Sequence, residues 1–243
     1  LNDIAQLASE WEMPAVAMTD HGNMFGAIDF YRAMRDVNVT PIIGCEVYCA
    51  RESRFDKKPL PGLQSGSNHL VLLAKDNTGY KNLIKLVSAG YLDGFYYNPR
   101  IDKEILREYS EGLVCLSACV GGEIPYLIET EGYKAAQKMV EVYQDIFGDD
   151  YYLEIQRHGI DKEKVINPGL EKLHKEMGVP MVATNDSHFT RAGDHEAHAA
   201  LVAIQTGKTL NAPNRMCYPE GVYFKSAQEM YELFEDMPHV LEQ

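Results

Sequence analysis

The sequence contains no apolar run that approaches the ~20 residues needed to span a bilayer, and no basic and apolar leader stands at its start. We therefore expect no membrane partner, and nothing in the sequence predicts secretion. Hydrophobic residues make up 45% and charged residues 24% of the 243 positions. This composition is close to the globular norm and excludes a disordered chain, and the length suits one large domain or two small ones.

Basic residues are scarce beside acidic ones. The chain has 23 Lys and Arg against 36 Asp and Glu, which gives a formal net charge of -13. Such a chain repels phosphate backbones, so we do not expect it to bind nucleic acid by general electrostatics. A nucleic-acid enzyme remains compatible with this charge if other domains or bound metal cations attract the DNA.

Several common chemical motifs are also absent. Cys45 and Cys49 are four positions apart, as are Cys115 and Cys119, so neither pair has the C-x-x-C spacing of a zinc knuckle or redox motif. An odd cysteine count predicts free thiols in a reducing, cytoplasmic setting. There is no G-x-x-x-x-G-K phosphate loop and no G-x-S-x-G nucleophile elbow.

Short apolar runs alternate with helical patterns along the chain. Six strands are predicted, over residues 15–18, 41–48, 69–74, 112–116, 151–155 and 180–184. Helices are predicted over residues 1–11, 27–34, 80–89, 133–147, 161–177, 195–205 and 226–234. This alternation favours a parallel sheet covered on both faces. The length suits a (β/α) barrel, with a doubly wound sheet as the alternative, and residues 51–68 are predicted to form a solvated loop.

Polar residues gather where the predicted strands begin or end. They include Asp20, His21, Glu46, His69, Cys119, Glu154, His158, Asp186 and His188. The C-terminal strand ends of parallel α/β folds form the active-site face, and these residue types bind zinc, manganese or iron. Singly, most of them are commoner in turns, helix caps or cores, but together they predict a metal site.

Two carboxylates carry most of this prediction. Glu46 lies in an apolar strand, where a carboxylate costs several kcal/mol unless it is paired or bound to metal. Asp186 and His188 are alternate residues, which point to one side of an extended segment. A cluster of this size suggests two or three cations ~4 Å apart, which lower the pKa of a bridging water and clamp phosphoryl oxygens. Phosphoester hydrolysis is favoured, with amide or amine hydrolysis as the alternative.

Several segments resemble the PHP (polymerase and histidinol phosphatase) domain. They are Thr19-Asp-His-Gly-Asn23, Gly44-Cys-Glu-Val-Tyr48, His69-Leu-Val-Leu-Leu-Ala74, Leu116-Ser-Ala-Cys119 and Ala183-Thr-Asn-Asp-Ser-His-Phe189. Residues 77–83 and 224–238 resemble the version at the N-terminus of bacterial DNA polymerase III alpha subunits. The resemblance covers residues 1–243, with 207–243 leading toward a polymerase core, and implies a distorted (β/α)7 TIM-like barrel.

The resemblance also implies a trinuclear centre of divalent transition metals, Zn, Mn or Fe. The matching ligand positions are His21, Glu46, His69, Cys119, Asp186 and His188. Glu46 and Asp186 are the expected catalytic residues. The family's other ligands, an N-terminal His-x-His and a following Asp, are expected upstream of Leu1 together with the first strand. His158 and His198 match no family ligand, so we expect them to support the site or pack against helices.

Three functions follow from the resemblance. The first is a metal-dependent phosphoesterase, a 3′–5′ exonuclease for proofreading within a replicative DNA-directed DNA polymerase whose own core uses Mg²⁺. Its partners would be DNA, reached through the polymerase, an exonuclease subunit and other replisome subunits. The second is a catalytically inactive module that docks the exonuclease subunit. The third is a free-standing phosphatase such as histidinol phosphatase.

Overall fold

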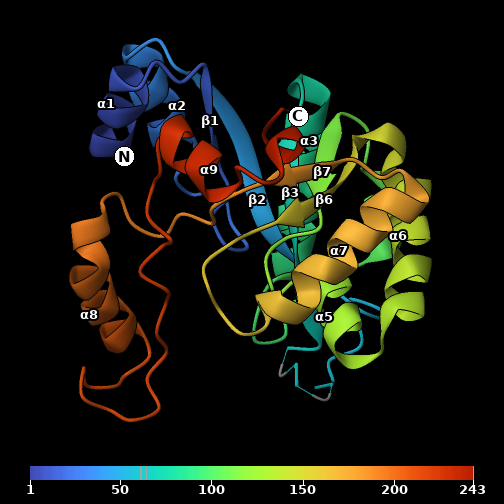
Figure 1. Ribbon diagram of the computed structural model, residues 1–243. Helices are drawn as coiled ribbons and strands as arrows, with labels where there is room; N and C mark the ends of the chain where they lie inside the picture. The colour runs from blue at the N-terminus through green and yellow to red at the C-terminus, as the bar shows by residue number, and fades with distance from the viewer. Residues whose placement is uncertain (61, 64, 243) are drawn as a thin grey trace.

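The strands form one sheet that curls into an open, distorted barrel (Figure 1). The structure is a computed structural model, and it describes residues 1–60, 62–63 and 65–242. Within these residues the strand order is β1-β2-β3-β5-β6-β7, with β4 paired to β2. The strands are β1 (Ala15–Met18), β2 (Thr40–Ala50), β3 (Ser67–Ala74), β4 (Arg100–Ile101), β5 (Leu113–Leu116), β6 (Tyr151–Ile155) and β7 (Met181–Ala183). The expected class, a distorted TIM-like barrel, is therefore confirmed.

The prediction of an all-parallel sheet is wrong at one strand. β1 with β2, β2 with β4, β5 with β6 and β6 with β7 are parallel pairs, but β3 is antiparallel to both β2 and β5. The described part of residues 51–66 contains no helix, so no crossover connection is available and the chain turns back beside β2. As a result, the first residues of β3 lie at the edge where β2 ends.

All seven predicted helices are present, and the described residues contain two further α-helices that were not predicted. The helices are α1 (Asn2–Glu10), α2 (Ala27–Asp36), α3 (Asn77–Leu92), α4 (Lys103–Glu108), α5 (Glu123–Thr130), α6 (Tyr133–Phe147), α7 (Glu163–Met177), α8 (His195–Gln205) and α9 (Ala227–Leu233). α4 and α5 are short, so their apolar spacing gives little periodic signal. No helix in the described part of the chain is long and apolar enough to cross a membrane.

The two largest apolar clusters of the described residues stabilise this arrangement. The larger one joins the buried faces of β2, β3, β5 and β6 to helices α3, α5, α6 and α7. The smaller one joins β1 to α1 and α2 through residues such as Met18, Phe30 and Met34. Figure 1 shows α1 and α2 on one flank of the sheet and α5, α6 and α7 on the other. All five cysteines are free thiols, as predicted.

The described part of the predicted solvated loop is partly exposed, and its backbone is anchored. The Arg100 guanidinium, only 1% exposed, donates hydrogen bonds to the carbonyls of Arg54, Asp56 and Ser65 in this loop, and to that of Gly94. The interaction fixes the described part of residues 51–66 against β4. Residues 67 and 68, assigned to the loop from sequence, belong to β3.

Candidate metal centre

The structure brings the six predicted ligand residues to one edge of the sheet. β1, β2, β5 and β7 run in the same direction and end at this edge, whereas the reversed β3 begins there. The six residues are His21 after β1, Glu46 within β2, His69 within β3, Cys119 after β5, and Asp186 and His188 after β7. The antiparallel direction of β3 is thus the reason that His69 lies beside strand ends.

Backbone pairing continues past the strands and fixes this part of the site. The amide of Gly22 donates to the carbonyl of Glu46 at 2.8 Å, and the amide of Glu46 donates to the carbonyl of Asp20 at 3.1 Å. On the other side, the amide of His69 donates to the carbonyl of Gly121 at 2.9 Å. These ladder bonds hold His21, Glu46 and His69 in register without relying on their side chains.

The carboxylate of Glu46 is the centre of the cluster. Its Oε1 lies 2.7 Å from His21 Nδ1 and 2.8 Å from His69 Nδ1. Burial alone would raise the pKa of Glu46, but the hydrogen bonds and charges of the two histidines outweigh burial and lower the pKa to about 2. The bond to Glu46 in turn raises the pKa of His21. Glu46 is therefore ionised at neutral pH despite being 4% exposed.

Cys119 adds a sulfur to this cluster. Its Sγ lies 3.6 Å from His69 Nδ1, and one ligand atom each from Glu46, His69 and Cys119 all lie within 4.8 Å of one another. Burial raises the pKa of the Cys119 thiol well above its usual value, an effect that a coordinated cation offsets because it deprotonates a thiol. Oxygen, nitrogen and sulfur ligands together suit zinc or iron better than magnesium.

Asp186 and His188 approach the cluster through a turn. Asp186 has φ 46°, in the left-handed region, so the expectation of an extended segment is wrong. His188 Nδ1 donates to the carbonyl of Asp186 at 2.7 Å, which leaves the lone pair on Nε2. That nitrogen is buried and has no hydrogen-bond partner within the described residues. A buried ring nitrogen of this kind fits a metal ligand, and the His188 ring lies 5.6 Å from that of His21.

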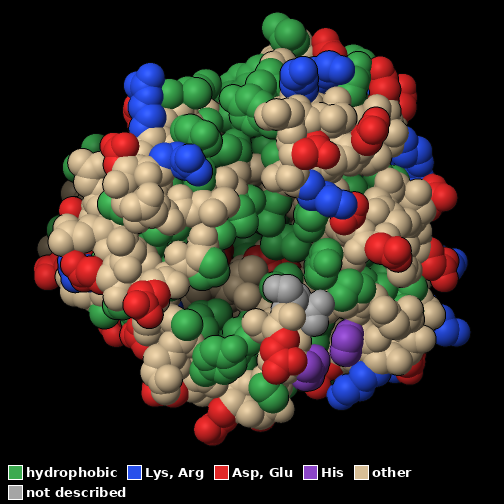
Figure 2. Space-filling model, turned by 90° about the horizontal axis from the view of Figure 1, so that it is seen from above, with side chains coloured by type: hydrophobic (Ala, Val, Ile, Leu, Met, Phe, Trp, Pro, Cys, Tyr) green, Lys and Arg blue, Asp and Glu red, His purple; other side chains and the backbone are tan. Residues whose placement is uncertain are grey.

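A cavity of about 800 Å³ lies inside the open barrel. Apolar side chains of β1, β3, β5 and β7 form much of its wall, and His21, Glu46, Asp186 and His188 also line it. Figure 2 shows a hollow with hydrophobic side chains on its walls. The candidate centre therefore faces a cavity as well as the edge of the sheet.

Residues 1–158 match the sequence pattern of the PHP domain, which is more than half of the chain. The chain belongs to the PHP domain family. It is 47% identical to the DNA polymerase III subunit alpha of Borreliella burgdorferi over the whole chain and 21% of that protein. It is 49% identical to that of Thermus aquaticus over 90% of the chain and 18% of that protein. The chain thus spans about a fifth of the length of the curated relatives it matches.

A third relative and one solved structure complete the comparison. The DNA polymerase III subunit alpha of Campylobacter jejuni is 42% identical over the whole chain and 21% of that protein. A solved structure from Bifidobacterium adolescentis, of a suspected metal-dependent phosphoesterase, matches with a TM-score of 0.47 and 12% identity. That match covers 96% of this chain and 89% of the other. It is too weak to bear on the function of this PHP domain.

Glu154 is a residue of this PHP domain that the predicted ligand set leaves out. Glu154 belongs to β6, and it lines the same cavity as the predicted ligands His21, Glu46, Asp186 and His188. Its Oε1 accepts from Thr184 Oγ1 at 2.5 Å and from Gln156 Nε2 at 2.9 Å, while its Oε2 has no partner in the described part of the chain. Burial raises the pKa of Glu154 to about 7, with a further contribution from Asp186. The sequence feature that could have identified Glu154 as a site residue is the one used for Glu46, a carboxylate in an apolar strand.

His158 and His198, two of the histidines outside the ligand set, lie next to the PHP centre. His158 Nε2 lies 3.1 Å from the carbonyl oxygen of Asn185, the residue before Asp186. The ring of His198 packs edge-on against His188 at 5.8 Å and against Tyr218 at 5.1 Å. A supporting role for these two histidines stays a prediction.

Proposed function

We propose that this PHP domain holds two or three divalent transition-metal ions and hydrolyses phosphodiesters at DNA 3′ ends. The observation that carries the proposal is the convergence of Glu46, His69 and Cys119. In the same site, the buried Nε2 of His188 has no hydrogen-bond partner among the described residues. When bound, such cations lower the pKa of a coordinated water and clamp phosphoryl oxygens. Zn, Mn and Fe fit the ligand types best.

The residues of this chain have distinct roles in the proposal. His21, His69 and His188 offer ring nitrogens, Cys119 offers a thiolate, and the carboxylates of Glu46 and Asp186 can each bridge two cations. Glu46 needs no deprotonation step because its pKa is about 2. Glu154, with a pKa of about 7, can hold a proton near neutrality. That proton belongs on Oε2, because Oε1 already accepts two hydrogen bonds.

The parent protein is proposed to be a DNA polymerase III alpha subunit, because the relatives that align with this chain carry that name. In such a protein residues 207–243 would lead toward a polymerase core that uses Mg²⁺, in the cytoplasm. The net charge of -13 argues that DNA is held mainly by that core and is delivered to this domain. An exonuclease subunit and other replisome subunits are the proposed protein partners.

The proposal is tested by metal analysis and hydrolysis with the protein at its natural length. We expect two to three equivalents of transition metal after dialysis, and Mn²⁺- or Zn²⁺-dependent shortening of a single-stranded DNA labelled at its 5′ end. Asp186→Asn should abolish the shortening with little change in fold, because asparagine also tolerates the left-handed region. Asp29→Asn, at an exposed position of α2, is the matched control. Less than one equivalent of metal, or full activity of Asp186→Asn, would contradict the proposal.

A second candidate function, a module that docks the exonuclease subunit, is favoured by an exposed apolar patch. The patch consists of Phe25, Ile28, Tyr91, Leu92 and Phe95, of which Phe25 and Leu92 are 82% and 83% exposed. The Phe25 and Tyr91 rings lie 6.3 Å apart, so the end of α3 continues the surface beside α2. Contiguous apolar surfaces of this kind mark protein interaction sites. Loss of binding to the purified exonuclease subunit in Leu92→Ser, with metal content unchanged, would support it.

A further inference from the structure

The end of β6 makes a series of side-chain contacts with the segment that precedes Asp186. Glu154 and Gln156 both bond Thr184 Oγ1, at 2.5 and 3.0 Å. His158, two residues further on, bonds the carbonyl of Asn185 through Nε2 at 3.1 Å. Three alternate residues thus contact the two consecutive residues between β7 and Asp186. Strand pairing of β6 with β7 ends earlier, at Ile155 and Ala183.

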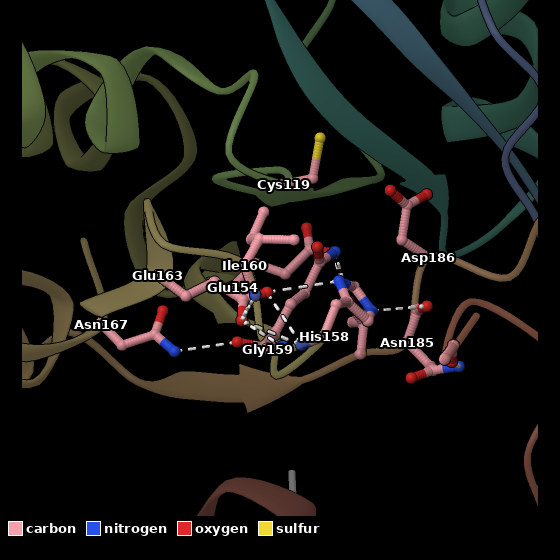
Figure 3. A network of polar contacts seen from close by, with 12 residues as sticks. Cys119, Glu154, His158, Gly159, Ile160, Glu163, Asn167, Asn185 and Asp186 are labelled. Carbon is pink, nitrogen blue, oxygen red and sulfur yellow. Dashed lines mark hydrogen bonds and ion pairs between the residues drawn. The ribbon is translucent and has the colours of Figure 1, made fainter. Parts of the chain in front are cut away.

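His158 is itself anchored by Glu163 at the start of α7. The Glu163 carboxylate accepts from the backbone amides of His158 and Gly159 at 2.9 Å and of Ile160 at 3.3 Å. Its Oε1 also lies 3.3 Å from His158 Nδ1. Figure 3 shows the ring between Glu163 and Asn185, with Asp186 beyond. Both side chains of the pair are under a tenth exposed, so the ring has a defined position between two oxygen acceptors.

Asn185 is held from the opposite side as well. Its Nδ2 donates to the carbonyls of Gly221 and Tyr223 at 3.0 and 2.6 Å. The next residue, Asp186, has φ 46°, a conformation that persists only when the surrounding structure enforces it. The contacts of Asn185 fix the residue directly before this turn, and one of them comes from His158.

We propose that His158 is a positioning residue, which, anchored by Glu163, holds the Asn185 carbonyl and so keeps Asp186 in the turn that directs Asp186 and His188 into the metal centre. This inference rests on the proposed metal-binding function. It differs from a ligand role, because both ring nitrogens of His158 already face oxygen atoms. Groups that orient metal ligands through such contacts affect metal affinity strongly.

The test compares two variants in the protein at its natural length. His158→Phe keeps a ring but removes the donor, whereas His158→Gln places an amide donor where Nε2 stood. The control is His174→Phe, because His174 Nδ1 also bonds a backbone carbonyl, that of Val179 at 2.7 Å, on the far part of α7. Co²⁺ is the probe, since its absorption bands report the ligand geometry. Amide hydrogen exchange of residues 184–190 in metal-free protein is the second readout.

We expect His158→Phe to weaken Co²⁺ binding about 10-fold, to alter the absorption bands and to speed exchange over residues 184–190. His158→Gln should restore binding to within about threefold of the parent and slow exchange again. His174→Phe should change neither readout, whatever its melting temperature. Parental affinity and exchange in His158→Phe would overturn the inference, and so would equal damage in both His158 variants. A parent that binds no Co²⁺ would refute the proposed metal function, while the exchange comparison would still decide the role of His158.

Discussion

The two halves of the candidate metal centre are held in place by different means. His21, Glu46 and His69 sit on strands or on backbone pairs that extend them, so the peptide ladder fixes their positions. Asp186 and His188 lie beyond the end of β7 on an irregular segment. The side chains of Glu154 in β6 and of His158 beyond β6 hold this segment. A ladder-held half should tolerate changes in neighbouring side chains, because its contacts are made by the backbone. A side-chain-held half should respond to single substitutions that touch no ligand.

Glu46→Gln should have the largest effect, because it removes the central acceptor of the ladder-held half. We expect loss of measurable Co²⁺ binding. In metal-free protein the pKa of Glu46 is about 2 against an ordinary 4.5. Its stabilisation is therefore complete above pH 4.5 and is lost as the pH falls toward 2, a contribution of about 3 kcal/mol. Urea unfolding between pH 3 and 6 should show a shallower acid loss for Glu46→Gln than for the parent.

Glu154→Gln should have a comparable effect on stability with the opposite dependence on pH. Between the unfolded pKa of 4.5 and the folded pKa of about 7, the unfolded chain releases its proton while the folded protein keeps it. The parent therefore loses about 3 kcal/mol of stability as the pH rises through this window. Glutamine resembles the neutral acid, so metal-free Glu154→Gln should match the parent at pH 4 and exceed it at pH 8. The exposed Glu141→Gln should show no such difference, and a pH-independent gap for Glu154→Gln would contradict the assignment.

Thr184→Val should have a smaller effect on stability, and it tests whether the side-chain-held half depends on contacts that include no ligand. The substitution removes the hydroxyl that donates to Glu154 and accepts from Gln156. Glu154 and Gln156 keep only their bond to each other, so we expect a stability cost of about 1.5 kcal/mol. Because the change lies in the side-chain-held half, we also expect weaker Co²⁺ binding, whereas Thr209→Val at an exposed position should change neither quantity. Unaltered metal binding together with the stability loss would show that the β6 contacts do not support Asp186.

His198→Phe should have the smallest effect. Its ring contacts His188 and Tyr218 by packing, and phenylalanine preserves an aromatic edge, so we expect a stability change below about 1 kcal/mol. Co²⁺ affinity should stay within about threefold of the parent, since no ligand is removed. A larger loss of affinity would mean that His198 binds the metal.

The same contrast explains what the sequence could predict. Strand positions followed from apolar runs, and each of the six predicted strands is present with bounds that differ by at most two residues. The direction of β3 could not be predicted, because the apolar pattern of a strand is the same whether it runs parallel or antiparallel to its neighbours. The loop predicted over residues 51–68 was the available clue, because no helical pattern stands between the two strands in the sequence. His69 was predicted to open this strand and is the third residue of β3. Only an antiparallel β3 brings this end of the strand to the cluster.

The side-chain-held half was harder to predict because its geometry depends on long-range contacts. The left-handed turn at Asp186 is set by Asn185 and His158, residues 27 positions apart. Glu154 was visible as a polar residue near a strand end, but its pKa depends on burial inside the folded barrel. The first turn of α7 starts at Glu163, two residues later than predicted, because the Glu163 carboxylate binds the amides before the helix.

The anchoring of residues 51–66 by Arg100 has a consequence for how this segment can vary in evolution. The guanidinium binds backbone carbonyls, which every amino acid supplies, so this interaction sets no requirement on the side chains of Arg54, Asp56 and Ser65. The length of the segment is constrained, because an insertion or deletion would move the carbonyls away from the planar guanidinium of Arg100. Gly66 is constrained as well, since it has φ +64° and a Cβ there would lie 2.7 Å from the carbonyl oxygen of Lys58. Lysine could not replace Arg100, because a single ammonium cannot span four acceptors.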